Sequence, residues 1–142
     1  MPSAAHRWLV LWAARKLAHD GYAVRGFDGP APQGGVWNLL PRPPDLAGVR
    51  PDVWGVHSRT GEYALGEAKT AQDLDTEHTR IQLRVFSSIR QLSGSDYCRL
   101  YIAAPRSAVR SLDKVLAQLQ LLRAQHVIRL MVPDCLLEEA AL

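Results

Sequence analysis

The chain has 142 residues, 47% of them hydrophobic and 22% charged, which is the composition of one globular domain with a core of its own. No apolar run reaches the ~18 residues that a membrane-spanning helix requires, and the early apolar stretch lacks the cleavage site of a signal peptide. We therefore expect a single cytoplasmic domain over residues 1–142, with no membrane partner. The net charge of +3 favours an anionic partner. Cys98 and Cys135 both lie in apolar runs and are expected to be buried free thiols.

The first half of the chain begins with a predicted helix and continues with a strand. Apolar residues at helical spacing predict the helix over residues 3–19, with Ser3 as its N-terminal cap. The β-rich segment 22–27 predicts the strand. Residues 28–51 hold most of the prolines and are predicted to form a long irregular loop, with a short strand or turn at 36–40.

A β-hairpin and an alternation of helices and strands follow. The hairpin is predicted from two strands, 52–57 and 62–70, joined by a four-residue turn. The remaining predicted elements are a helix over 74–92, a strand over 97–105, a helix over 107–124 and a strand over 126–133. The order α-β-β-β-α-β-α-β predicts an α/β fold in which helices flank a mixed central sheet.

Three details of packing follow from these elements. The buried stripe of the helix over 74–92 is expected to consist of Ile81, Val85, Phe86, Ile89 and Leu92. Thr76 or Asp75 can cap that helix, and Ser107 is expected to cap the next one. The small residues on one face of the second hairpin strand predict close packing of a helix there; they are Ala64, Gly66 and Ala68.

The turn length determines which residues of the predicted hairpin face each other. With a four-residue turn, His57 pairs with Glu62, and Asp52 then lies opposite Glu67. Directly opposed side chains share one face of a sheet, and Lys69, two residues beyond Glu67, points to that face too. The hairpin is therefore predicted to gather two carboxylates and one ammonium group at one end of the sheet.

This grouping predicts a metal site with hydrolytic chemistry. Two carboxylates in contact repel each other, and a divalent cation between them removes the conflict. Mg²⁺ binds through one or two carboxylates and leaves room for phosphate oxygens, so the candidate ligands are Asp52, Glu67 and the backbone carbonyl of Ala68. Lys69 can orient a nucleophilic water or neutralise developing charge. Together these groups predict hydrolysis of a phosphodiester with Mg²⁺, for which Mn²⁺ is expected to substitute.

The letters "PD" at 51–52, followed after fourteen residues by "EAK" at 67–69, resemble the motif of the PD-(D/E)xK nuclease superfamily. The predicted element order over residues 3–105 is similar to the core of that superfamily. The resemblance implies a restriction-endonuclease-like fold and a metal-dependent DNA endonuclease. "QLRVF" at 82–86 is similar to the glutamine-x-x-x-tyrosine element of the RecB-like branch, with phenylalanine in place of tyrosine. Gln82 then either hydrogen-bonds a water or the scissile phosphate, or is simply a partly buried polar residue.

The opening "RKLAHDGYAVRGF" resembles that of small Holliday-junction resolvases of this superfamily, which implies structure-selective cutting of branched DNA. Those enzymes usually carry a further metal-binding glutamate on the first helix, whereas the first glutamate of this chain is Glu62. His6 is a candidate substitute, although a histidine there is more often a surface residue. The difference favours a site with one metal ion, held by Asp52 and Glu67.

Fourteen of the seventeen basic residues are arginine, the side chain best suited to bidentate binding of phosphate. The arginines expected to contact DNA lie near the predicted site or on the helix that follows it: Arg42, Arg50, Arg59, Arg80 and Arg84. Trp37, in the long loop, is expected to anchor that loop, or alternatively to stack on a base.

Other polar residues receive a structural interpretation. Asp45, in a second Pro-Asp pair, comes seven residues too early for the hairpin pairing. Asp73 and Asp75 are interpreted as turn and capping residues rather than metal ligands. His78, four residues before Gln82, is interpreted as a surface residue.

The sequence thus favours a Mg²⁺-dependent, structure-selective DNA endonuclease, and three other interpretations stay open. The first is a restriction-type or phage recombination nuclease. The second is a non-catalytic DNA-binding or assembly subunit with the same fold. The third is an unrelated α/β protein in which Glu67 and Lys69 are charges on a solvated strand. Symmetric cutting of two strands requires a twofold dimer, whose interface the apolar tail 136–142 could form.

Overall fold

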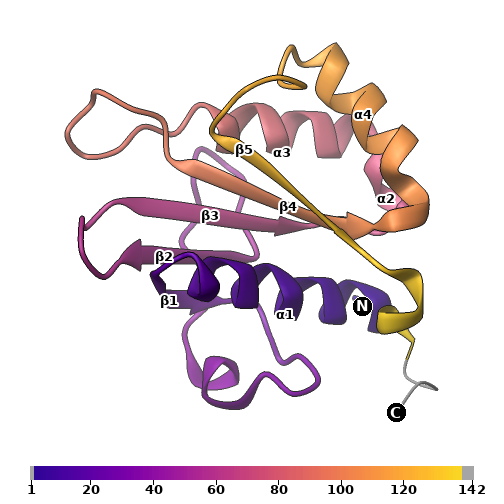
Figure 1. The fold of residues 1–142 in the computed structure, drawn as a ribbon, viewed down its shortest axis with the longest axis horizontal. Coiled ribbons are helices and arrows are strands. Elements are labelled where there is room, and N and C mark those ends of the chain that lie inside the picture. Colours follow the sequence, from indigo (N-terminus) through magenta and orange to yellow (C-terminus); the bar gives the residue numbers. More distant parts are fainter. Residues whose placement is uncertain (1, 139–142) are drawn as a thin grey trace.

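The computed structural model describes residues 2–138, in which five strands form one mixed sheet. The strands lie side by side in chain order (Figure 1). The first three pair antiparallel, and β3–β4 and β4–β5 pair parallel. Their bounds are β1 Tyr22–Phe27, β2 Val53–His57, β3 Tyr63–Ala68, β4 Arg99–Pro105 and β5 Val127–Val132. The expected α/β fold with a mixed sheet is confirmed.

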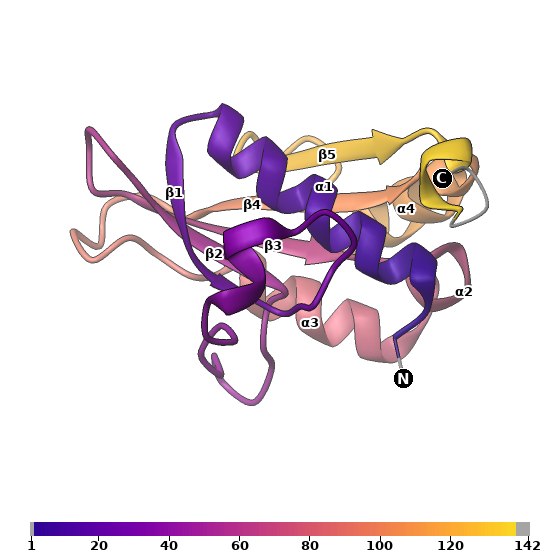
Figure 2. The same cartoon turned by 90° about the horizontal axis from the view of Figure 1, so that it is seen from below.

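Helices cover both faces of this sheet (Figure 2). One face carries α1 (Ala4–His19), and the other carries α2 (Ala71–Leu74), α3 (Glu77–Ser87) and α4 (Val109–Gln118). The described part of the chain also contains three short 3₁₀ helices: η1 (Gly35–Leu39), η2 (Arg106–Ala108) and η3 (Asp134–Leu137). Each face has its own buried apolar cluster. Over residues 2–138, no helix combines the length and the apolar character that a membrane crossing needs.

The helix α1 approaches β3 closely because the strand has small residues on that face. A Cβ built on Gly66 would lie 3.4 Å from Leu17 Cδ1, 3.5 Å from Ala13 Cβ and 3.2 Å from Val53 Cβ. Ser3 caps the helix as expected, since its hydroxyl accepts a hydrogen bond from the His6 N–H at 3.1 Å. The capped first turn of α1 therefore lies beside the end of the β2–β3 hairpin.

The helix predicted over residues 74–92 is shorter than expected and is preceded by the single turn α2. Thr76 caps α3, accepting from the Thr79 N–H at 3.1 Å, and the helix ends at Ser87. Ile81 and Leu92, both expected in its buried stripe, are 43% and 85% exposed. The prediction was wrong for both residues. Leu92 lies five residues beyond the end of α3, and Ile81 lies within the helix but on its solvent side, since the buried apolar residues of α3 are Leu83 and Phe86.

The early end of α3 has a physical reason in the contact between Gln91 and β3. The Gln91 side-chain amide accepts from the Tyr63 N–H at 2.7 Å and donates to the Tyr63 carbonyl at 2.8 Å. It thus satisfies both backbone groups of the first residue of the strand. A helix running to residue 92 would carry Gln91 away from this contact.

The expected cap of the last helix is also corrected. Ser107 lies in η2, and its backbone N–H and hydroxyl both donate to the Asp134 carboxylate, at 3.0 and 2.5 Å. The helix α4 begins only at Val109, without a side-chain cap. Ser107 therefore links η2 to η3 at the carboxyl end of β4 and β5 instead of starting a helix.

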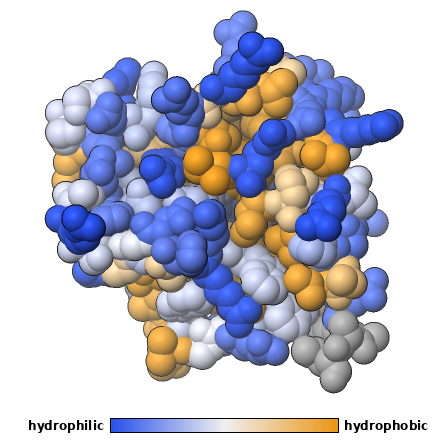
Figure 3. All heavy atoms as spheres, in the orientation of Figure 1, coloured by the Kyte–Doolittle hydropathy of each residue, from blue (hydrophilic) through white to orange (hydrophobic). Residues whose placement is uncertain are grey.

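The irregular segment between β1 and β2 forms the 3₁₀ helix η1 where a short strand or turn was expected. The Trp37 ring packs on Phe27, with ring centroids 6.1 Å apart, so this tryptophan anchors the loop. Val36 and Leu39 point outward and are largely exposed. Figure 3 shows apolar side chains at the lower edge of the molecule, in the region that η1 occupies in Figure 1.

The two cysteines differ in burial. Cys98 is buried, as expected, and burial raises the pKa of its thiol to about 11. Cys135 is exposed in η3, so the expectation of burial was wrong for this residue. The last residues of the tail expected at a dimer interface, 139–142, lie outside the described residues.

Gly66→Val tests the close packing of α1 on β3. The added side chain would press on Leu17 and Ala13, and overpacking of this kind costs about 1–3 kcal/mol of unfolding free energy. Equilibrium denaturation by urea measures the loss. Ala71→Val, on the exposed turn α2, is the matched control and should change stability by less than ~0.5 kcal/mol. Equal effects of the two substitutions would contradict the packing described here.

Candidate functional site

The register of the β2–β3 hairpin is the predicted one. Val53 pairs with Gly66 and Val56 pairs with Tyr63, and the His57 N–H donates to the Glu62 carbonyl at 2.7 Å. The Asp52 N–H continues this ladder by donating to the Gly66 carbonyl at 3.0 Å. Asp52 therefore stands at the entrance of β2, beside the last residues of β3.

Backbone and side chain both hold the Asp52 carboxylate in place. Its Oδ2 accepts a hydrogen bond from the Ala68 N–H at 2.9 Å. The same oxygen lies 3.5 Å from Nε2 of His6, on the first turn of α1. The residue is buried, so this carboxylate is fixed between the end of the hairpin and the start of the first helix.

Glu67 is the most deeply buried ionisable residue of the site, at 2% exposure. Its Oε2 lies 3.3 Å from Nζ of Lys69. Its Oε1 is buried and has no hydrogen-bond partner among residues 2–138. A buried carboxyl oxygen without a partner is costly, and it is a natural ligand for a cation.

Lys69 joins the hairpin to α3. Its backbone N–H donates to the Ala103 carbonyl on β4 at 2.9 Å, which fixes the chain just beyond β3. Its buried ammonium group contacts Glu67 and makes a short hydrogen bond to Oε1 of Gln82. The structure therefore brings Gln82 to the site, as expected, through its contact with this lysine.

The pKa values of the two carboxyl groups shift in opposite directions. Burial, and then the charge of Asp52, raises the pKa of Glu67 well above its ordinary value. Burial also acts to raise the pKa of Asp52, but the hydrogen bond and the charge of His6, together with the Ala68 N–H, hold it below its usual range. The hydrogen bond to Asp52 in turn raises the pKa of His6. Of the two, Asp52 therefore ionises more readily, and Glu67 keeps its proton to higher pH.

A divalent cation fits these groups only with help from the backbone. Among the described residues, no cluster of three or more histidine, cysteine, aspartate and glutamate side chains is arranged to hold a metal ion. Along a strand, the N–H and C=O of one residue point to the same neighbouring strand. The Ala68 carbonyl therefore faces the side on which its N–H meets Asp52. Two carboxyl groups, one backbone carbonyl and water make the kind of oxygen ligand set that Mg²⁺ accepts.

His6 was not among the predicted site residues, although it was considered as a substitute for a first-helix glutamate. The structure brings its Nε2 to Asp52, and its Nδ1 is buried without a hydrogen-bond partner among residues 2–138. The sequence does place His6 three residues after the capping Ser3, in the first turn of a helix that packs on the small residues of β3. It did not reveal where that turn would lie relative to the hairpin.

The arginines expected to contact DNA fall into two groups. Arg42 pairs with Asp28 at 3.2 Å, and the Asp28 N–H donates to the Asp52 carbonyl at 2.8 Å. Arg50 is exposed two residues before Asp52. On α3, Arg84 is exposed and Arg80 is held by Asp75 and Gln118. Four of the five arginines therefore lie near the carboxylates in sequence or on the helix that carries Gln82.

Arg59 lies elsewhere, and its expected place beside the site was wrong. It is exposed in the turn between β2 and β3, whereas Asp52 and Glu67 are at the opposite end of that hairpin. Five strand residues separate the two ends, a distance of about 16 Å. The register that gathers the carboxylates therefore also carries Arg59 away from them.

Asp45, Asp73 and His78 take the structural roles that were expected, whereas Asp75 forms ion pairs and Thr76 caps α3. Asp45 accepts the Gly48 N–H at 2.8 Å within its own turn, so the second Pro-Asp pair is separate from the site. Asp73 accepts from the Thr70 hydroxyl at 3.0 Å, Asp75 binds the ammonium group of Lys114 at 2.7 Å, and His78 is exposed.

The raised pKa of Glu67 predicts how the stability of the metal-free protein depends on pH. The contribution of protonated Glu67 is fully present below the ordinary value of 4.5, and it is lost as pH rises through the raised pKa. Glu67→Gln keeps a neutral group at every pH. In EDTA, this variant should be more stable than the wild type at neutral pH and equal to it below pH 4.5.

Urea denaturation between pH 4 and 8 measures this difference. Glu62→Gln is the matched control, because Glu62 is an exposed glutamate on the same hairpin, and it should follow the wild-type curve. A Glu67→Gln curve parallel to that of the wild type would show that Glu67 titrates normally.

Comparison with family models, with curated proteins and with solved structures finds no match for this chain. The description of the site therefore depends on its own geometry: two adjacent buried carboxyl groups, a lysine held by a glutamine, and a histidine from the first helix. The resemblance to PD-(D/E)xK nucleases stays a prediction from the sequence.

Proposed function

We propose that this protein is a metal-dependent nuclease with a restriction-endonuclease-like fold, which hydrolyses phosphodiester bonds in DNA. The observation that carries the proposal is the pair of buried carboxyl groups, Asp52 and Glu67, beside Lys69 at the end of one hairpin. The ion pair with Lys69 uses only one oxygen of Glu67, Oε2. The other oxygen, Oε1, is buried without a hydrogen-bond partner among residues 2–138 and is suited to bind a cation.

Asp52, Glu67 and the carbonyl of Ala68 would hold Mg²⁺, with Mn²⁺ as a substitute. When bound, the ion neutralises the two carboxylates and stabilises negative charge on the phosphate during hydrolysis. His6 keeps the Asp52 carboxylate oriented from the side of α1, and the Ala68 N–H does so from the hairpin. Asp52 therefore offers a fixed oxygen to the ion, and its carboxylate needs little reorganisation.

Lys69 and Gln82 form the second half of the proposed active site. The lysine Nζ contacts both Glu67 and Gln82 Oε1, so its position is set from two sides. Because the glutamine oxygen accepts from the lysine, its amide NH₂ is left to donate to a phosphate oxygen or to the attacking water. Lys69 orients that water and offsets the charge that develops on the phosphate.

The exposed arginines support a DNA substrate that is recognised through its backbone. Arg50 precedes the site and Arg84 lies on the helix of Gln82, where both can meet phosphates. Contacts to the DNA backbone do not distinguish one base sequence from another, so they favour recognition of DNA shape. We therefore propose a structure-selective, resolvase-like substrate preference and a homodimer that presents two active sites to a branched DNA.

Cleavage of three labelled DNAs tests this function: a four-way junction, a linear duplex and a single strand, each with Mg²⁺ or with EDTA. Asp52→Asn should lower the cleavage rate by roughly 100-fold or more, because the ion loses a ligand worth several kcal/mol. Asp45→Asn, in the other Pro-Asp pair, is the matched control and should cleave as the wild type does.

The outcomes separate the interpretations. Cutting in EDTA, or cutting by Asp52→Asn at the wild-type rate, would refute the mechanism. Equal cutting of all three DNAs would remove the resolvase-like preference and keep the nuclease. Tight binding without cutting under any metal would indicate a DNA-binding or assembly subunit.

A second pair of variants tests the role of Gln82. Gln82→Leu should reduce the cleavage rate by roughly 100-fold, as removal of one positioned donor does, and should leave the binding of DNA largely unchanged. His78→Leu, one helical turn earlier and exposed, should have little effect. If both substitutions reduce cleavage alike, the glutamine supports only the helix and not the reaction.

A further inference from the structure

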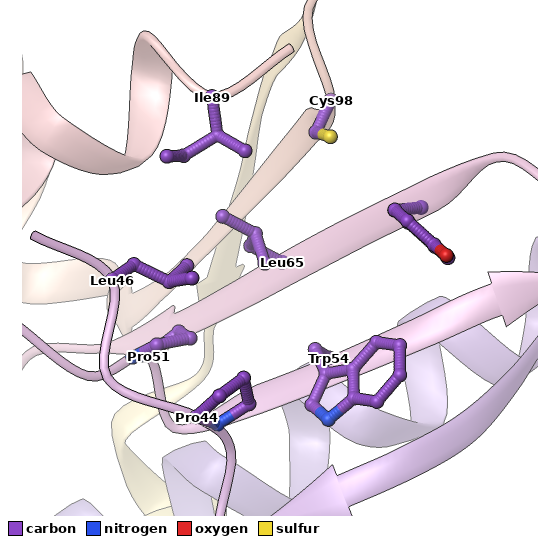
Figure 4. Close-up of a pocket in the computed structure, with 8 residues that line it drawn as sticks. Pro44, Leu46, Pro51, Trp54, Leu65, Ile89 and Cys98 are labelled. Carbon is purple, nitrogen blue, oxygen red and sulfur yellow. The ribbon is translucent and has the colours of Figure 1, made fainter. Parts of the chain in front are cut away.

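An apolar cavity of about 230 Å³ lies over the hairpin that carries the candidate site, and Figure 4 shows the residues that line it. The irregular segment before β2 contributes Pro44, Leu46 and Pro51, and the hairpin contributes Trp54 and Leu65. Ile89, just after α3, lies across from them. The lining is almost wholly hydrocarbon, and the cavity is smaller than those that take drug-sized ligands. It has room for one flat ring system or one large side chain.

The cavity begins beside the carboxylates and extends along the hairpin toward its turn, since Tyr63, the first residue of β3, and Cys98 also line it. Pro51 directly precedes Asp52. Trp54 and Leu65 each stand two residues from a site carboxylate along their strand, Trp54 from Asp52 and Leu65 from Glu67. Side chains two residues apart point to the same face and are about 7 Å apart. A phosphate at the site would therefore leave its neighbouring nucleoside within reach of the cavity.

The aromatic wall of the cavity is held in place. The indole of Trp54 lies over Gly26 of β1, where a Cβ would come within 2.4 Å of the ring. On its other side, Tyr63 meets Trp54 edge to face, with ring centroids 5.8 Å apart. An immobilised indole can stack on a partner ring without losing further freedom.

We infer that this cavity receives one unpaired nucleobase of the DNA whose backbone lies at the carboxylate site. The inference rests on the proposed nuclease function and specifies its substrate as DNA with an unpaired nucleotide next to the cleaved bond. The exposed Arg50 directly precedes the lining residue Pro51 in the chain, and the nearby Asp45 accepts a hydrogen bond within its own turn. This charge suits a phosphate backbone. The near absence of polar groups in the lining predicts stacking that accepts any base.

The competing occupant is an apolar side chain from a second copy of this chain. Leu39 and Val36 are exposed and could enter such a cavity. The nucleobase is favoured because Trp54 and Leu65 of the lining lie next to the carboxylates along their strands, and because the exposed Arg50 directly precedes Pro51. The experiment below distinguishes the two occupants.

Binding is measured with Ca²⁺ in place of Mg²⁺, on three duplexes of equal length. One is fully paired, one carries a single unpaired thymidine, and one carries an abasic residue at that position. The wild-type protein should bind the unpaired thymidine about tenfold more tightly than the abasic residue, since stacking of one base is worth ≈ 1–3 kcal/mol. Leu46→Trp, which fills the cavity from its half-exposed loop, should lose this preference. Leu39→Trp, an exposed leucine on η1, should keep it.

Each other outcome counts against the inference. Equal affinity of the wild type for the thymidine and abasic duplexes, with cleavage intact, would overturn the base pocket and leave the nuclease function standing. Retention of the preference by Leu46→Trp would place the base elsewhere. If the wild type shows no base preference, and Leu46→Trp converts a dimer to a monomer in sedimentation velocity, the cavity would be assigned to a second copy of the chain. Absence of both binding and cleavage would overturn the function and the pocket together.

Discussion

Two carboxyl groups that are buried side by side cannot both carry a charge unless a cation lies near them. Asp52 and Glu67 stand in this relation at the end of the β2–β3 hairpin, and much of the surrounding structure acts on their charges. His6 and the Ala68 N–H stabilise the charge of Asp52, while Lys69 faces Glu67. Replacing such a cluster by apolar residues often stabilises a protein. Its presence is therefore better explained by binding or chemistry than by stability.

Three separate elements bring the partners of these carboxyl groups together. The small face of β3 lets α1 approach closely, which carries the first turn of that helix to Asp52. The parallel pairing of β3 with β4 fixes the backbone of Lys69 on Ala103. Across the sheet, α3 places Gln82 against the lysine ammonium group. The mixed sheet thus serves as a rigid frame, with one helix on each face contributing one polar side chain.

Much of this arrangement was predictable because it depends on local geometry. Strand alternation has a period of two, and a four-residue turn determined the register that puts Asp52 beside Glu67. The same register implied that Arg59 lies at the far end, a consequence that the motif-based expectation overlooked. The position of His6 was not predictable, because it depends on how α1 crosses the sheet. The early end of α3 depends on the contact of Gln91 with Tyr63, residues that lie far apart in sequence and are joined only by the tertiary fold.

The contacts of Asp52 also differ in how soon folding can form them. The hydrogen bond from the Ala68 N–H joins residues 16 apart in sequence and forms as the hairpin closes. The contact with His6 spans nearly three times that separation, and closing the longer loop costs about 1 kcal/mol more chain entropy. It exists only because α1 packs on the sheet. The hairpin alone thus brings both carboxyl groups together through a short loop, whereas the histidine depends on the packing of a distant helix.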